Sequence, residues 1–134
     1  MRVERASYLM EVTMSDVLVY RDARAAAVEP GVLIAAACER WTSAVFVPEE
    51  GDLSSSTHGQ LQLTSAQGTV LVELLASTGG LNVQGDDESV AEFLVWLSHW
   101  PGLPPGWMAW PSQSPEPLPL SPGLTALQVL DSER

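Results

Sequence analysis

The chain lacks several features that narrow its chemistry. It contains no lysine, one cysteine and two histidines among 134 residues. A single cysteine, Cys38, excludes an internal disulfide framework. No apolar run approaches the roughly 18 residues of a membrane helix, and residues 32–38 form the longest. No apolar segment with a cleavage site follows the N-terminus, so we expect no secretory signal. These absences together predict a cytoplasmic protein.

Negative charge is the most informative property that is present. The formal net charge is −11. Residues 1–40 hold five Arg and six acids, whereas residues 41–133 hold eleven acids and neither Arg nor Lys. Such a field repels phosphate backbones and anionic lipid, so we expect no nucleic-acid and no membrane partner. It attracts a basic protein. The alternative is that the acids only maintain solubility.

The length fits a single domain spanning residues 1–134. Residues 60–64 alternate strictly, residues 69–75 are more fully apolar, and residues 81–84 alternate again. Short turns separate these three segments, which predicts an antiparallel meander over residues 60–84. Segments 8–14 and 43–47 are also typical of strands. The predicted fold is therefore α+β, with an antiparallel sheet of about four to five strands and two to three helices packed on it.

Helices are indicated at two places, and a third segment is ambiguous. Residues 32–41 follow Pro30 and are rich in Ala, which predicts a buried helix. Asp86 and Asp87 start the clearest helix, with apolar residues at helical spacing, and Pro101 ends it at Trp100. Residues 17–20 fit a second strand, or the opening of a helix capped by Ser15 or Asp16 that runs through the alanines at 23–27.

The segment 101–123 contains eight of the ten prolines. A stretch of this length without regular structure is unusual in a compact domain. Residues 107–110 suggest a short edge strand within it. Ser121 and Pro122 then suggest the start of a short helix with Leu124, Leu127 and Leu130 on one side, and a strand over 126–130 is the competing interpretation.

No pattern of catalytic or metal-binding residues stands out. Cys38 with His58 or His99 has the residue types of a thiol nucleophile and base, but an Ala-rich helix favours Cys38 as a small core residue. Asp86, Asp87, Glu88, Glu92 and His99 have the residue types of a metal site, yet helix capping and the helix dipole already explain the acids. We therefore predict no catalytic residue, no metal and no cofactor.

Tryptophans cluster beside the acidic helix. Trp96, Trp100, Trp107 and Trp110 fall within fifteen residues. One interpretation packs them into the core, and the other makes them a binding face, because Trp is enriched at interface hot spots. On the second interpretation, a rim of acids lies beside aromatic anchors. The predicted partner-binding residues are Asp86, Asp87, Glu88, Glu92, Trp100, Trp107 and Trp110.

The chain is small, its negative charge is concentrated in residues 41–133, and it combines strands, an acid-capped helix and a Pro-rich segment that returns to the fold. In these respects it is similar to the small acidic α+β immunity proteins of polymorphic-toxin systems. The resemblance lies in composition and element pattern, and no family residue is carried over. It implies an inhibitor that blocks the basic cleft of a bacterial toxin. The alternatives are a secretion chaperone or adaptor for an effector protein, and a small ligand-binding domain or enzyme whose site is scattered in sequence.

Overall fold

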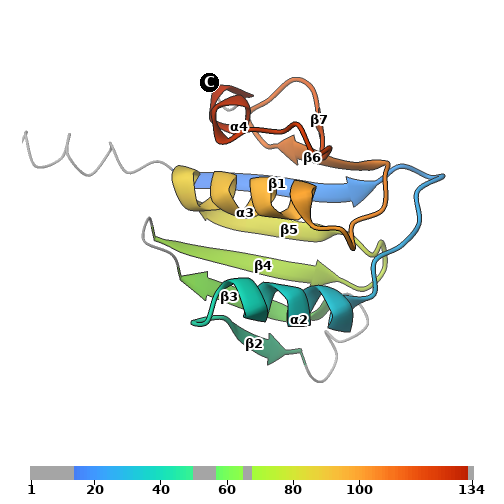
Figure 1. The fold of residues 1–134 in the computed structure, drawn as a ribbon, viewed down its shortest axis with the longest axis vertical. Coiled ribbons are helices and arrows are strands. Elements are labelled where there is room, and N and C mark those ends of the chain that lie inside the picture. Colours follow the sequence, from blue (N-terminus) through green and yellow to red (C-terminus); the bar gives the residue numbers. More distant parts are fainter. Residues whose placement is uncertain (1–13, 50–56, 65–67, 133–134) are drawn as a thin grey trace, which may run out of the picture.

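A seven-stranded antiparallel sheet organises the chain (Figure 1). The computed structural model describes residues 14–49, 57–64 and 68–132. The α+β class is confirmed, but the expectation of four to five strands is wrong in number. The strands are β1 (Met14–Arg21), β2 (Val45–Pro48), β3 (Thr57–Thr64), β4 (Thr69–Leu75), β5 (Leu81–Asp86), β6 (Trp107–Pro111) and β7 (Leu118–Pro119). The helices are α2 (Pro30–Arg40), α3 (Asp87–His99) and the short α4 (Ala126–Ser132).

The predicted meander is present as β3, β4 and β5. These strands pair in sequence order, and the whole sheet runs β2-β3-β4-β5-β1-β6-β7. Because side chains alternate along a strand, each strand presents one set of residues to each face. Leu61, Val72, Val83 and Val17 stand side by side on four neighbouring strands, and all four are fully buried. This row is the centre of the core.

Residues 15–21 form a strand, which decides between the two interpretations of that segment. Val17 and Val19 are buried, whereas Leu18 between them is 44% exposed, so the period is two and not 3.6. The alanines at 23–27 continue as turn and extended chain. Of the strand expected at 8–14, only Met14 falls in the described residues. The first of the two expected short turns, between residues 64 and 69, likewise lies largely outside them.

Helix α3 connects β5 to β6 across β1. Both strands pair antiparallel with β1, one on each side of it, so β5, α3 and β6 form a parallel unit split by β1. The helix packs Val90, Phe93, Leu94 and Leu97 onto the sheet, and each is at most 1% exposed. Figure 1 shows α2 and α3 on the same face of the sheet.

Two helices differ from what the sequence predicts. Helix α2 is only partly buried, because Leu33 and Ala37 are its buried residues while Cys38 is exposed. Helix α4 begins at Ala126, after Thr125 and Gln128 exchange hydrogen bonds in a capping box. Leu127 is 66% exposed and Val129 is fully buried, so the expected stripe of leucines is wrong at Leu127.

The Pro-rich segment contributes two strands to the sheet. β6 lies between β1 and β7, so the expectation of an edge strand at 107–110 is wrong. The two-residue β7 is the edge, and it pairs Leu118 and Pro119 with β6. Gly106 precedes β6 with φ +98°, and its carbonyl accepts a hydrogen bond from the backbone N–H of Asp22. This left-handed turn suits glycine and brings the segment back to the end of β1.

None of the helices in the described part of the chain combines the length and the apolar character needed to cross a membrane.

Candidate protein-binding surfaces

Two of the predicted partner-binding acids hold the start of α3. Asp86 is the N-cap, and its carboxylate accepts hydrogen bonds from the backbone N–H (3.2 Å) and the hydroxyl (2.9 Å) of Ser89. Asp87 accepts a hydrogen bond of 2.6 Å from the hydroxyl of Ser15, which is buried on β1. These carboxylates join the helix to the sheet, so they already have partners within the fold.

Glu88 and Glu92 belong to a different feature, a row along one face of α3. They are followed at the same spacing of four residues by Trp96 and Trp100, and residues four apart on a helix are neighbours. We call these four residues the α3 stripe; at 1.5 Å per residue it is about 18 Å long. It begins with two carboxylates and ends with two indole rings that stack at 5.9 Å and 14°.

Three residues of the α3 stripe, Glu88, Glu92 and Trp96, line a groove between the helices. The carboxylate of Glu92 is 2.8 Å from the guanidinium of Arg40 at the end of α2, and both side chains are half-exposed. On the other side of the stripe lies α4. This helix groove has a volume of about 460 Å³ and opens to solvent. Its lining residues are Arg40, Glu88, Ala91, Glu92, Val95, Trp96, Ala126 and Leu130.

Packing fixes the position of Trp96 in this groove. Its ring meets Trp41 edge-on at 5.2 Å and lies 5.7 Å from the ring of Phe93. Arg40 lies over the Trp41 ring of this cluster, with its guanidinium carbon 4.6 Å from the ring centroid. The groove therefore presents one firmly packed indole, that of Trp96, beside the carboxylates of Glu88 and Glu92, an open arrangement suited to a protein side chain rather than to an enclosed ligand.

The other two predicted tryptophans lie elsewhere. Trp107 is 2% exposed, and its indole N–H donates to the carbonyl of Ala26 at 3.0 Å. Trp110 is 42% exposed on the face of the sheet opposite α3. The structure thus brings together Glu88, Glu92 and Trp100 through the α3 stripe. It separates Trp107 and Trp110 from that stripe.

Trp96 completes the α3 stripe but was not among the predicted partner-binding residues. The signal for it is the spacing of four residues, which continues from Glu88 and Glu92 to Trp96 and Trp100. The sequence also gives Trp96 an equally good place in the core, and its contacts with Trp41 and Phe93 show that it partly occupies one.

A second concave surface lies on the open face of the sheet, where β5, β1 and β6 are neighbours. Its volume is about 420 Å³ and it opens to solvent. We call it the sheet hollow. Trp110 forms one wall, and its indole N–H donates to the carbonyl of Ser114 at 3.0 Å. The lining residues are Asp16, Leu18, Asn82, Trp110, Pro111, Ser112 and Ser114.

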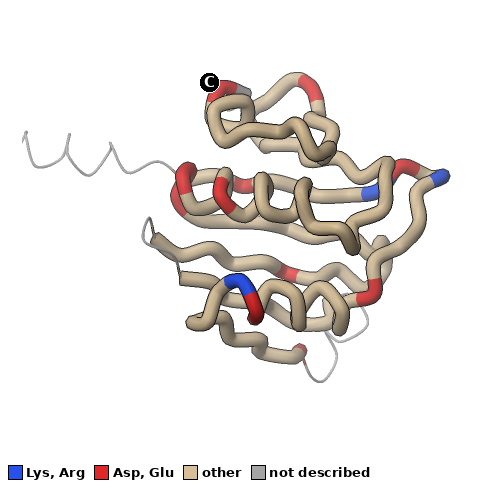
Figure 2. The backbone as a smooth tube through the Cα atoms, viewed as in Figure 1, with Lys and Arg blue, Asp and Glu red and all other residues tan. Residues whose placement is uncertain are grey.

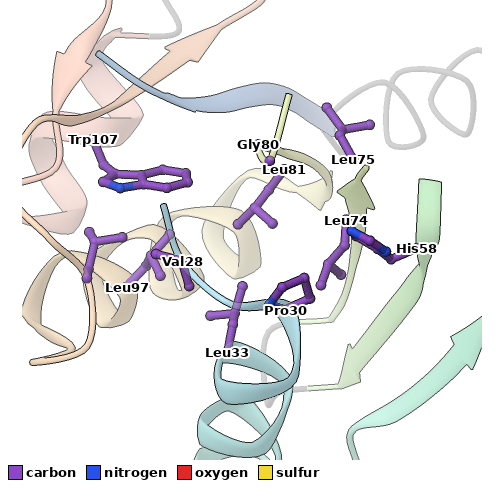
Figure 3. A pocket seen from close by; sticks show the side chains of 12 residues that line it. Val28, Pro30, Leu33, His58, Leu74, Leu75, Gly80, Leu81, Leu97 and Trp107 are labelled. Carbon is purple, nitrogen blue, oxygen red and sulfur yellow. The ribbon is translucent and has the colours of Figure 1, made fainter. Parts of the chain in front are cut away.

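A third pocket lies between α2, α3 and the sheet (Figure 3). Its lining is almost entirely apolar, with Leu33, Leu81, Leu97 and Trp107 directed toward one another and His58 at one side. The free space is about 20 Å³, which is enough for about one water molecule. Small-molecule pockets measure about 300–1,000 Å³, so this pocket is a packing feature of the core.

Charge is unevenly distributed over the fold. Figure 2 shows acidic residues gathered at the start of α3, while the basic residues lie at the far end of β1 and at the end of α2. Arg21 donates to the carbonyl of Ala25 at 2.9 Å, and Arg40 pairs with Glu92. That pair is the one ion pair formed between described residues. Most described carboxylates are therefore not neutralised by a neighbouring cation.

The described residues contain no group of three or more His, Cys, Asp or Glu side chains close enough to hold a metal ion. The His99 ring contacts the carbonyl of Val95 at 2.8 Å, within its own helix.

No family model matches the chain, and neither the search of curated proteins nor that of solved structures gives a match.

Proposed function

We propose that this protein binds and inhibits a basic protein, as the immunity or antitoxin partner of a bacterial toxin in the cytoplasm. The observation that carries the proposal is the α3 stripe. Two carboxylates and the indole of Trp96 line a solvent-open groove, and the indole of Trp100 stacks on Trp96 at the end of the stripe, in a chain with a net charge of −11. Carboxylates attract lysine and arginine, and tryptophans supply buried area once a partner covers them.

The proposed mechanism is occlusion of the toxin's active-site cleft. A nuclease, for example, needs a cationic cleft to hold its phosphate backbone, and an acidic surface competes for those cations. The long-range field speeds association, whereas the indole rings slow dissociation. In this mechanism Glu88 faces the cleft, Glu92 exchanges its ion pair with Arg40 for a cation of the toxin, and Trp96 and Trp100 pack against the rim of the cleft. Asp86 and Asp87 contribute to the field while they hold the start of the helix.

The two alternatives have less support. A small ligand or substrate needs an enclosed pocket with convergent polar groups. The apolar pocket between α2, α3 and the sheet has about 20 Å³ of free space, and the helix groove and the sheet hollow are open to solvent. A secretion chaperone usually works as a dimer, so light scattering distinguishes that role from a monomeric inhibitor.

Binding to the protein encoded beside this chain's own gene tests the proposal. The double variant Glu88→Gln/Glu92→Gln should associate about tenfold more slowly at low ionic strength, and its rate should depend less on salt. Glu73→Gln with Glu116→Gln is the matched control, since it removes the same charge at positions outside the helix groove, with Glu73 on the open face of the sheet, and it should change the rate less than about threefold.

Inhibition should follow binding, so cells that express the toxin domain should survive with the wild-type chain and the control variant. Tight binding that ignores salt and tolerates Glu88→Gln/Glu92→Gln would overturn the electrostatic mechanism.

A further inference from the structure

The open face of the sheet carries most of the exposed large hydrophobic side chains of the described chain. Five of the seven exposed large hydrophobic side chains of the described chain lie on it, and no described helix covers it. A row of polar residues lies between these hydrophobic side chains. It consists of Gln60, Glu73 and Asn82, which are neighbours on β3, β4 and β5. The five hydrophobic residues are Met14, Leu18, Val45, Val47 and Trp110.

The sheet hollow is the concave part of this face, and its walls are rigid. The Trp110 ring is fixed by its hydrogen bond to Ser114 and lies 6.5 Å from the ring of Tyr20. The backbone N–H of Ser112 donates to the carbonyl of Asp16 at 2.9 Å, which ties the loop after β6 to β1. A preformed hollow of this kind binds without a large ordering cost.

The chemistry of the sheet hollow is that of a site for a cationic side chain. Asp16 is the one charged residue in its lining, and the rest are an aromatic ring, aliphatic groups and neutral hydrogen-bonding groups of Asn82, Ser112 and Ser114. The Asp16 carboxylate makes no hydrogen bond to another described residue. It is therefore available to an incoming donor.

We infer that the sheet hollow binds an arginine side chain of a basic protein. A guanidinium is planar, so it can stack on the indole of Trp110 while it donates two parallel hydrogen bonds to Asp16. Lysine offers a point charge and cannot do both equally well. The amide of Asn82 and the hydroxyls can accept its remaining N–H groups.

Charge complementarity selects this occupant over a second copy of the chain. Two copies that meet through this face would bring Asp16 and Glu73 of each against acids of the other, at a net charge of −11 per chain. A basic partner would neutralise the same carboxylates. The inference rests on the proposed function for the nature of the partner, and it adds a contact face that does not involve the α3 stripe.

Nuclear magnetic resonance of the ¹⁵N-labelled full chain tests the inference with a defined probe. The peptide acetyl-Gly-Arg-Gly-amide should give saturable shifts at the Trp110 indole N–H and the amides of Asp16, Leu18 and Asn82. The same peptide with citrulline, which is neutral and nearly isosteric, should bind at least about tenfold more weakly. The lysine peptide should fall between the two.

Variants then locate the binding. Asp16→Asn should weaken binding of the arginine peptide about tenfold, and Trp110→Leu should weaken it about fivefold. Glu73→Gln is the matched control, because it removes a carboxylate from the same face but outside the sheet hollow, and it should change binding less than twofold. Dispersed spectra of each variant confirm that it is folded.

Three results would overturn the inference: no saturable shift at the sheet hollow, equal binding of arginine and citrulline peptides, or broadening of this face with protein concentration alone, which indicates a second copy. These results are independent of the proposed inhibition. If the Glu88→Gln/Glu92→Gln variant loses the toxin while the sheet hollow ignores arginine, the inference fails and the proposed function stands. If the sheet hollow binds arginine but no toxin is inhibited, the proposed function fails and the inference stands.

Discussion

At the scale of single residues, β6 sends its two tryptophans to opposite faces of the sheet. Trp107 and Trp110 are three positions apart, and an odd spacing along a strand reverses the face. Trp107 consequently enters the core, where its indole N–H satisfies the carbonyl of Ala26. Trp110 emerges on the open face, where its N–H fixes a surface loop. The same residue type therefore stabilises the fold at one position and shapes a surface at the other.

Substitution of these two residues should have very different costs. Trp107→Phe leaves the Ala26 carbonyl without its donor and opens space in the core, so we expect a loss of about 2–3 kcal/mol in the free energy of unfolding. Trp110→Phe removes an exposed hydrogen bond and should cost less than about 1 kcal/mol. Urea unfolding followed by far-ultraviolet circular dichroism measures both without relying on tryptophan fluorescence. Equal losses in the two variants would contradict the assignment of Trp107 to the core.

At the scale of secondary-structure elements, α3 has the strongest local signals. Asp86 caps it through two hydrogen bonds from Ser89, and Pro101 follows directly after its C-cap residue, Trp100. Asp and Asn are equally good N-caps, whereas Ala cannot accept a hydrogen bond. The stability of this helix should therefore depend on the acceptor oxygen of residue 86 more than on its charge.

Asp86→Ala should lower the free energy of unfolding by about 1–2 kcal/mol, because the Ser89 N–H loses its acceptor at the start of a helix. Asp86→Asn keeps an acceptor oxygen and should cost less than about 0.5 kcal/mol. Urea titration of the two variants beside the wild type measures the difference. If Asn costs as much as Ala, the charge and not the cap stabilises α3, and the interpretation of Asp86 is wrong.

Local pattern explains which elements the sequence predicts well. β3, β4, β5 and α3 follow one another with short turns, and each is marked by its own periodicity and caps. The position of β6 between β1 and β7 depends on pairing between residues about 90 positions apart, which no local pattern records. The number of strands was underestimated for the same reason, since the two-residue β7 exists only through its pairing with β6.

The two candidate surfaces also differ in how far local sequence pattern predicts them. The α3 stripe follows from a spacing of four residues along one helix, so three of its four residues are predicted from the sequence, and the same spacing points to the fourth, Trp96. The sheet hollow combines Asp16, Asn82 and Trp110 from three different strands. Only the order of β5, β1 and β6 in the sheet brings these residues together, and that order is set by the crossing of α3 over β1.

At the scale of the whole molecule, unbalanced charge acts against the compact state. Carboxylates at a net charge of −11 repel one another, and folding brings them closer than they are in the unfolded chain. The ion pair between Arg40 and Glu92 offsets little of this, because half-exposed pairs contribute about 0–1 kcal/mol. Self-repulsion should therefore outweigh local attraction in this fold.

Added salt should therefore stabilise the protein. Between about 10 mM and 300 mM NaCl the Debye length falls from roughly 30 Å to 6 Å, which screens repulsion between separated carboxylates. We expect the melting temperature to rise by about 3–6 °C, the shift that about 1 kcal/mol produces in a chain of this size. Scanning calorimetry at several salt concentrations measures this rise in melting temperature, and KCl should act like NaCl.

The double variant Glu39→Gln/Glu116→Gln should melt at a higher temperature than the wild type at low salt, and its melting temperature should rise less when salt is added. A melting temperature that falls as salt is added would mean that attractive ion pairs dominate. The expectation that repulsion between carboxylates destabilises the folded state would then be wrong.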